Sequence, residues 1–340
     1  MNSLITLTNF GSLQLAGGSC GWTSPPAGAS GLRGHWASIS GAAAAIFTRA
    51  DRAAERVEFE VPDERFGSVR LTGFYRRDGN DSLAVILHGL AGSAESHYCA
   101  AAASAASRAR YDSLRLSMRG ADSSGEDIYH AGLSADIGAV LAGRRLSRYC
   151  RVVLIGYSFG GNLAIRAAID SVDPRIAAVA AVCPPLDLRA VMEGCDSASR
   201  FLYKYAIKTG LNRCYARVDA RGRAVTPYAV VARARRCSDW NEAAIVPRFG
   251  FRGTRDYYER TSVIPGLPGL NVPCLVVAGV NDPIVPAQTV RWALGRGTPT
   301  LSVRWGMGGH LSFPSNLNLG IADAPSGLEH QMFEWIRRNG

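Results

Sequence analysis

Lysine is nearly absent from this sequence of 340 residues. Only Lys204 and Lys208 occur, so arginine supplies almost all of the positive charge, and the net charge is +10. No apolar run approaches the roughly 20 residues that a membrane-spanning helix needs. The first residues also lack the basic segment and the small-residue cleavage site of a secretory signal. We therefore expect a cytoplasmic protein, and peripheral association with a membrane stays open.

Metal-binding and cofactor-binding patterns are missing too. None of the eight cysteines forms a C-x-x-C pair, and no group of His, Cys and acidic residues has the spacing of a metal site. No G-x-G-x-x-G or phosphate loop opens a helix. The sequence therefore predicts no metal and no cofactor. Scattered cysteines are typical of buried thiols in a reducing compartment, although a disulfide between two of Cys195, Cys214 and Cys237 stays open.

The composition predicts a sizeable folded core. Hydrophobic residues make up 47% of the chain and charged residues 19%, which argues against disorder. No internal repeat or low-complexity linker occurs. The patterns along the chain predict an N-terminal arm at residues 1–50, a core made of residues 51–186 and 268–340, and an insertion at residues 187–267.

The core pattern changes after its first two strands. Residues 56–61 and 68–75 alternate polar and apolar side chains, which predicts an antiparallel hairpin. Continuous apolar runs follow, as in strands covered on both faces, and helical patterns separate them. This alternation predicts an α/β fold whose sheet is mostly parallel, with helices on both faces. The runs lie at 83–87, 112–116, 151–155, 175–182, 273–279 and 300–305, and the helices at 96–108, 133–146, 162–169 and 328–338.

The insertion interrupts this alternation. It is aromatic and rich in arginine, and its lack of strand character predicts a mostly helical lid. Residues 188–262 contain fifteen Lys and Arg against seven Asp and Glu. Such a segment is either a solvated basic surface or a site of attraction for an acidic substrate or an anionic membrane surface. We do not expect a nucleic-acid partner, because no nucleic-acid-binding module lies near it.

One stretch carries the chemistry. The strand at 151–155 runs into Gly156-Tyr157-Ser158-Phe159-Gly160, which has the G-x-S-x-G pattern of a nucleophile elbow, and a helix follows. Glycines on both sides allow the strained turn that exposes the serine hydroxyl. Ser158 is therefore the predicted nucleophile, although the same pattern occurs in ordinary glycine-rich turns.

A serine nucleophile needs a base and an acid that orients the base. Asp282 and His310 each follow a later predicted strand, and carboxyl ends of strands are where open α/β sheets bind ligands. We predict His310 as the base and Asp282 as the acid. Asp282 also suits a simple turn before Pro283, and the rival acid Asp187 is better explained as a helix cap. The other histidines of the core lack this position: His88, His97, His130 and His330.

The reaction of an acyl group also needs two donors for an oxyanion. The amide of Phe159, which follows the nucleophile, is one predicted donor. The second should come from the loop after the first parallel strand, His88-Gly89-Leu90, and we predict the amide of Leu90. His88 is expected to brace this loop.

Several short motifs resemble those of a known family. They are His88-Gly89-Leu90-Ala91-Gly92-Ser93, Met118-Arg119-Gly120, Tyr129-His130-Ala131-Gly132, Gly156-Tyr157-Ser158-Phe159-Gly160-Gly161-Asn162, Asp256-Tyr257-Tyr258 and Arg33-Gly34-His35-Trp36. Together they resemble the α/β-hydrolase superfamily, and more closely its YheT-like branch, over nearly the whole chain. The resemblance implies the α/β-hydrolase fold and a carboxylesterase with a Ser/Asp/His triad that acts on short- or medium-chain acyl esters. Two departures are Asn281, where the branch often has a second Asp, and the loosely matching stretch 212–236, so acyl-chain preference does not transfer.

The chain is thus expected to be a serine hydrolase that cleaves small-molecule carboxylic esters through an acyl-enzyme at Ser158. A thioesterase or an acyltransferase with the same triad is one alternative, because an acyl-enzyme can react with other nucleophiles. A non-catalytic binding protein on a hydrolase scaffold is another. Such a protein would normally lack a member of the triad, and none is missing here.

Overall fold

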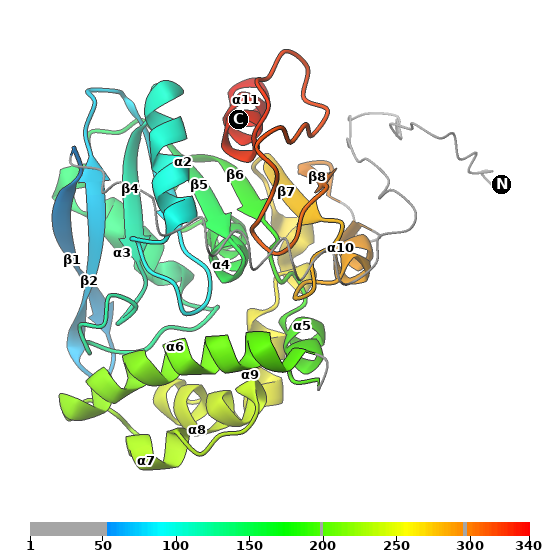
Figure 1. Cartoon of the computed structure of the whole chain (residues 1–340). Helices are drawn as coiled ribbons and strands as arrows, with labels where there is room; N and C mark the ends of the chain where they lie inside the picture. The colour runs from blue at the N-terminus through cyan, green and yellow to red at the C-terminus, as the bar shows by residue number, and fades with distance from the viewer. Residues whose placement is uncertain (1–52, 198–199, 295–297) are drawn as a thin grey trace.

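A single eight-stranded sheet organises the chain (Figure 1), in the order β1-β2-β4-β3-β5-β6-β7-β8. The computed structural model describes residues 53–197, 200–294 and 298–340, so the arm predicted at residues 1–50 lies outside the described residues. β1 pairs with β2 and β2 with β4 in antiparallel fashion, and all other neighbours are parallel. The predicted sheet, mostly parallel with an N-terminal antiparallel hairpin, is confirmed. The strands are β1 (Glu55–Asp63), β2 (Gly67–Arg76), β3 (Ser82–Leu87), β4 (Asp112–Ser117), β5 (Arg151–Tyr157), β6 (Ile176–Val182), β7 (Cys274–Gly279) and β8 (Leu301–Gly306).

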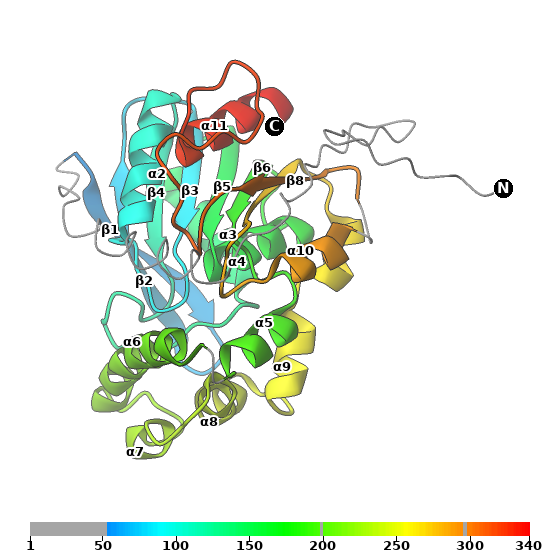
Figure 2. The ribbon, with the colours of Figure 1, turned by 45° about the vertical axis from the view of Figure 1, so that its right-hand side comes forward.

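The central strands are buried on both faces, as their continuous apolar sequences predict. Successive side chains of a strand point to opposite faces. In β3, Ala84 and Ile86 join the core formed with α2 (His97–Arg108) and α11 (Leu328–Asn339), whereas Val85 faces the core formed with α3 (Ser134–Ala142) and α4 (Phe159–Ile169). Figure 2 shows α2 and α11 together on one side of the sheet. A further helix, α10 (Ala287–Leu294), contacts β7.

The helix predicted at residues 133–146 is shorter than expected. α3 ends at Ala142, and the last three residues, Arg144–Leu146, form a separate 3₁₀ turn, η2. Gly143 between them has φ −60° and ψ 138°, which is extended backbone and therefore stops the helix. Glycine is a poor helix residue because its backbone loses more freedom than that of any other residue on folding.

Residues 187–267, which we call the helical segment, lie together along one end of the sheet (Figure 1). Asp187 caps the first helix, since its Oδ1 accepts a hydrogen bond from the amide of Ala190 at 3.0 Å. The rival acid of the sequence therefore has a structural role. The elements of the segment are α5 (Leu188–Cys195), α6 (Phe201–Ala220), α7 (Tyr228–Val231), α8 (Cys237–Phe249), α9 (Thr254–Thr261) and most of the 3₁₀ helix η4 (Ile264–Gly269), which extends two residues beyond it.

A buried ionic cluster joins the helical segment to the core. Arg248 of α8 and Arg119 after β4 both bind the carboxylates of Asp63 and Asp127, and Arg119 also binds Asp136 of α3 at 2.7 Å. Burial alone would raise the pKa of Asp63, but hydrogen bonds from Arg119 and Arg248 outweigh it and lower the pKa to about 2. Removing one partner would leave a buried charge unpaired, which is strongly destabilising, so such a cluster holds its elements in one arrangement. It fixes α8 against the core.

The cysteines of the described residues are free thiols. Cys195, Cys214 and Cys237 are among them, so the disulfide that the sequence left open is not formed. Cys195 and Cys237 are buried and behave as small apolar side chains. None of the helices in the described part of the chain is long and apolar enough to cross a membrane.

Candidate active site

Ser158 lies in the turn between β5 and α4. Its backbone has φ 50° and ψ −118°, a conformation that L-residues rarely adopt and that costs about 1–3 kcal/mol. A Cβ at Gly156 would lie 2.2 Å from the carbonyl oxygen of Gly160, and one at Gly160 would lie 2.4 Å from that of His88. Only glycine fits at these two positions. The close backbone approach lifts the Ser158 side chain away from the sheet.

The structure brings Ser158, His310 and Asp282 together. His310 Nε2 lies 2.9 Å from Ser158 Oγ, and His310 Nδ1 lies 2.8 Å from Asp282 Oδ2. The Asp282 side chain is only 1% exposed, and its Oδ1 accepts hydrogen bonds from the amides of Ile284 and Val285. The carboxylate therefore has a fixed orientation, and it can hold the imidazole with Nε2 toward the serine.

Cys183 lies beside Asp282 and His310, and the sequence did not indicate this position. It follows β6 with φ 48°, and its Sγ lies within 4.8 Å of ligand atoms of Asp282 and His310. Burial, together with the Asp282 carboxylate, raises the pKa of the Cys183 thiol well above its ordinary value. These three groups could be considered as metal ligands, but the direct contact between Asp282 and His310 leaves no space for an ion between them. The only sequence signal for Cys183 was its position directly after a predicted strand.

The two predicted oxyanion donors border the serine. Phe159 is the first residue of α4, where amides have no partner within the helix. In the other loop, the amide of Gly89 donates to Tyr98 Oη at 3.1 Å, and that of Ala91 donates to Tyr129 Oη at 2.8 Å. The Leu90 amide between them has no hydrogen-bond partner within the described part of the chain. It is thus available to an oxygen atom bound near Ser158, whereas its neighbours are held by tyrosines that the sequence did not single out.

His88 braces this loop, as the sequence predicted. Its Nδ1 lies 2.8 Å from the carbonyl oxygen of Gly89, and its Nε2 lies 3.1 Å from the amide nitrogen of Met118. A carbonyl can only accept and an amide can only donate, so the ring is neutral with its proton on Nδ1. Burial lowers the pKa of His88 to about 4.

Acid should destabilise the protein through His88. Its pKa is about 6.5 when unfolded and about 4 when folded, so the unfolded state binds more protons between these values. The contribution of His88 is complete above pH 6.5 and is lost as the pH falls toward 4. In denaturant titrations from pH 6 to 5, we expect His88→Gln to remove about 1.2 kcal/mol per pH unit from the slope of unfolding free energy. An equal slope in His88→Gln and in the original protein would contradict the prediction.

A cavity of about 690 Å³ opens above Ser158. Its walls come from the oxyanion loop, from α5, from α6 and from the loop after β7, and they are mainly apolar. No lysine, arginine or carboxylate is among the lining residues that the structure describes. The lining includes Leu90, Tyr98, Leu188, Val191, Met192, Tyr203, Ala206, Ile207, Ile284, Val285 and His310. Volume and polarity both suit an uncharged organic molecule.

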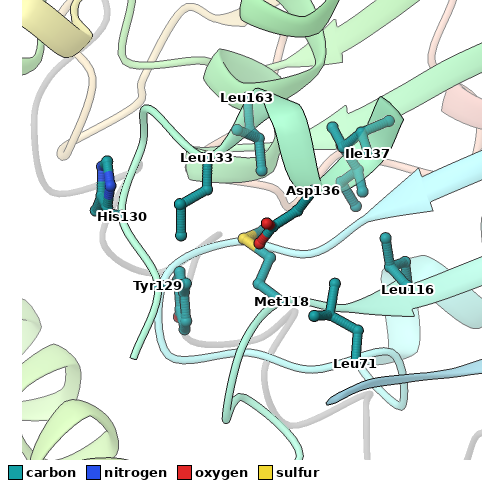
Figure 3. Close-up of a pocket in the computed structure, with 10 residues that line it drawn as sticks. Leu71, Leu116, Met118, Tyr129, His130, Leu133, Asp136, Ile137 and Leu163 are labelled. Atoms are coloured by element: carbon teal, nitrogen blue, oxygen red, sulfur yellow. The ribbon is translucent and has the colours of Figure 1, made fainter. Parts of the chain in front are cut away.

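A second cavity, beside Tyr129 and His130, is too small for a ligand. Figure 3 shows these two residues on one loop, with Asp136 on the neighbouring helix α3. The cavity measures about 10 Å³, which is the space of at most one water molecule. His130 packs against the rings of Phe249 and Phe251, and burial lowers its pKa to about 3. This histidine therefore belongs to the core, away from Ser158.

One glycine brings the helical segment into contact with the oxyanion loop. A Cβ at Gly210 of α6 would lie 2.5 Å from Cβ of Ala91, which itself has a positive φ of 61°. α6 therefore rests directly on the loop that carries the Leu90 amide. Either the helix or the loop must move if residue 210 gains a side chain.

Gly210→Ala is expected to lower kcat by about 10- to 100-fold, because a shift of about 1 Å in a catalytic group has effects of this size. Alanine favours the helix by about 1 kcal/mol, so the fold should persist. Thr209→Ala on the exposed side of the same helix is the matched control. Steady-state kinetics and thermal unfolding distinguish the outcomes, and an unchanged kcat in Gly210→Ala would refute the link.

Comparisons with known proteins concern the fold and the family of this chain. The family model described as alpha/beta hydrolase fold matches residues 85–317. YheT of Escherichia coli (strain K12), named a candidate esterase, is 26% identical over 242 residues, which cover 68% of this chain and 70% of that protein. The embryogenesis-associated protein EMB8 of Picea glauca is 26% identical over 261 residues, 73% of this chain and 56% of its own length.

Solved structures show the same fold at low identity. The Pyrococcus furiosus esterase Pf2001 superposes with a TM-score of 0.58 and 18% identity, covering 86% of this chain and 96% of that one. The 2,6-dihydroxy-pseudo-oxynicotine hydrolase gives 0.53 and 16%, covering 83% and 67%. Fold, serine turn and family match agree, and the chain belongs to the alpha/beta hydrolase fold family.

Proposed function

We propose that this protein is a serine esterase that hydrolyses uncharged carboxylic esters of short or medium acyl chain through an acyl-enzyme on Ser158. The observation that carries the proposal is the continuous hydrogen-bonded series Ser158–His310–Asp282, with spacings of 2.9 and 2.8 Å, beneath a mainly apolar cavity. The esterase names of YheT and of Pf2001 support the same reaction class.

Acylation uses each group in turn. His310 Nε2 takes the proton of Ser158 Oγ as this oxygen attacks the ester carbonyl. The carbonyl oxygen becomes an oxyanion and accepts hydrogen bonds from the amides of Leu90 and Phe159. The intermediate then collapses, and the leaving alcohol departs with the proton from His310. Asp282 stabilises the imidazolium throughout.

Deacylation repeats these steps with water. His310 removes a proton from a water molecule as the water attacks the acyl carbonyl, and the oxyanion again binds Leu90 and Phe159. Collapse releases the carboxylic acid and returns the proton to Ser158 Oγ. An alcohol or an amine in place of water would make the protein an acyltransferase.

Three measurements test the proposal. We expect hydrolysis of p-nitrophenyl esters in a series from acetate to palmitate, with the highest kcat/KM at short or medium length. A fluorophosphonate probe should add its mass to the peptide that contains Ser158 and to no other. Analysis of products in added alcohol separates hydrolysis from acyl transfer. If the protein neither hydrolysed these esters nor reacted with the probe, the proposal would be overturned and a binding role would be favoured.

A further inference from the structure

The positive charge of the helical segment is unevenly neutralised. Of its fifteen Lys and Arg side chains, eight form ion pairs, and Arg221, Arg223 and Arg248 do so with carboxylates of the core. The segment therefore has much less free charge than its sequence suggests. Most of the Lys and Arg side chains without an ion pair among the described residues lie on one helix.

Helix α6 carries most of this unpaired charge. Lys204, Lys208, Arg213 and Arg217 form no ion pair with any residue that the structure describes. The only acidic residue of the helix is Asp219, near its end, where it accepts a hydrogen bond from the amide of Tyr228. Both lysines of the protein thus lie one turn apart on the first half of this helix.

Large apolar side chains are exposed beside these lysines. Phe201 and Tyr205, four residues apart on one face of α6, are 60% and 72% exposed. The opposite face is turned inward: Tyr203 and Ile207 line the cavity, and Gly210 meets Ala91. Exposed aromatic rings next to lysines are typical of helices that lie in the interface of a membrane, where the rings enter the headgroup region and the cations meet anionic lipids.

The same helix forms a wall of the substrate cavity. Tyr203, Ala206 and Ile207 line the cavity, and Ala206 is also exposed to solvent. The cavity-lining face of α6 is therefore turned away from the exposed rings of Phe201 and Tyr205.

We propose that the first half of α6, with Phe201, Lys204, Tyr205 and Lys208, docks on an anionic lipid bilayer. Basic charge attracts the negatively charged surface, and the two rings bury their area in it. Docking does not depend on the ester chemistry, so it is measured without turnover.

The test uses the full-length protein and vesicles in a sedimentation assay. We expect binding to vesicles of phosphatidylcholine with phosphatidylglycerol, little binding to phosphatidylcholine alone, and release as salt rises, because salt screens the attraction. Lys204→Gln/Lys208→Gln should weaken binding by roughly 30-fold, since each basic residue near the surface contributes about 1 kcal/mol. Phe201→Ser/Tyr205→Ser should weaken it at least roughly tenfold through loss of buried apolar area.

The matched control is Arg233→Gln/Arg235→Gln. These two exposed arginines lie between α7 and α8 and form no ion pair within the described residues, so the variant loses the same charge at another place. It should bind within about twofold of the original protein. All the substituted side chains lie at the surface, and circular dichroism checks that each variant folds.

Three results would overturn the proposal. The first is no binding of the unaltered protein to anionic vesicles at low salt, which requires no variant. The second is equal loss in the lysine pair and the arginine pair, which would indicate only net charge. The third is a doubled mass by light scattering that the Phe201→Ser/Tyr205→Ser change abolishes while vesicle binding persists, which would assign the patch to a second copy of this chain.

Discussion

Replacing Ser158 with alanine is expected to lower kcat/KM for p-nitrophenyl butyrate by about 10⁵- to 10⁶-fold. Alanine keeps the backbone and the cavity but has no oxygen to attack the ester, so His310 has no proton to accept. The residual rate would come from water in contact with the donors at Leu90 and Phe159. Steady-state assays at high protein concentration give the ratio, and thermal unfolding gives the state of the fold.

Ser104→Ala is the control for this change. Ser104 is exposed on α2, where its Oγ accepts a hydrogen bond from Arg108, and it is not near His310. It should retain full turnover and full labelling by a fluorophosphonate. Ser158→Ala should lose both. A Ser158→Ala protein with more than a tenth of the original kcat/KM would exclude Ser158 as the nucleophile.

Replacing Asp282 with asparagine is expected to lower kcat by about 10⁴-fold. Ile284 and Val285 donate their amides to Oδ1 of residue 282, so the asparagine should keep its carbonyl oxygen there and turn its NH₂ group toward His310 Nδ1. The imidazole would then carry its proton on Nε2. Nε2 could no longer accept the proton of Ser158, although the geometry would be nearly unchanged.

Asp187→Asn is the corresponding control. Asp187 is the other acid that follows a strand, and it caps α5. Asparagine is also a good cap, so we expect a change below about 1 kcal/mol in unfolding free energy and no change in kcat. Rates for both variants are measured with the same ester. Equal kcat in Asp282→Asn and the original protein would show that another residue orients His310.

The spatial grouping of the predicted triad was within reach of the sequence because each residue follows a strand. Parallel strands end at one edge of the sheet, so Ser158, Asp282 and His310 had to lie near each other once the strands were identified. The first residue of α4 was harder to predict from the sequence. The prediction placed this residue at Asn162, because Gly160 and Gly161 have low helix propensity. The helix begins at Phe159, and close backbone contacts require glycine at these two positions.

The surroundings of the site depend on contacts between distant residues. Tyr129 holds the amide of Ala91 from 38 positions away, and nothing in either local sequence indicates it. Charge is a similar case. The excess of arginine in the helical segment can be counted from the sequence, but the pairing of these arginines with Asp63, Glu126 and Asp127 of the core is visible only in the fold.

The contact between Gly210 and Ala91 makes the substrate wall and the oxyanion loop one mechanical unit. An acyl chain too long for the cavity would press α6 outward, and the support of the loop at Ala91 would move with it. A poor fit at the distal end of a substrate would thus displace the oxyanion donors from the reacting carbonyl. Discrimination between chain lengths should then appear mainly in kcat, while KM changes little, as occurs when binding energy from a remote group is used to align the reacting atoms.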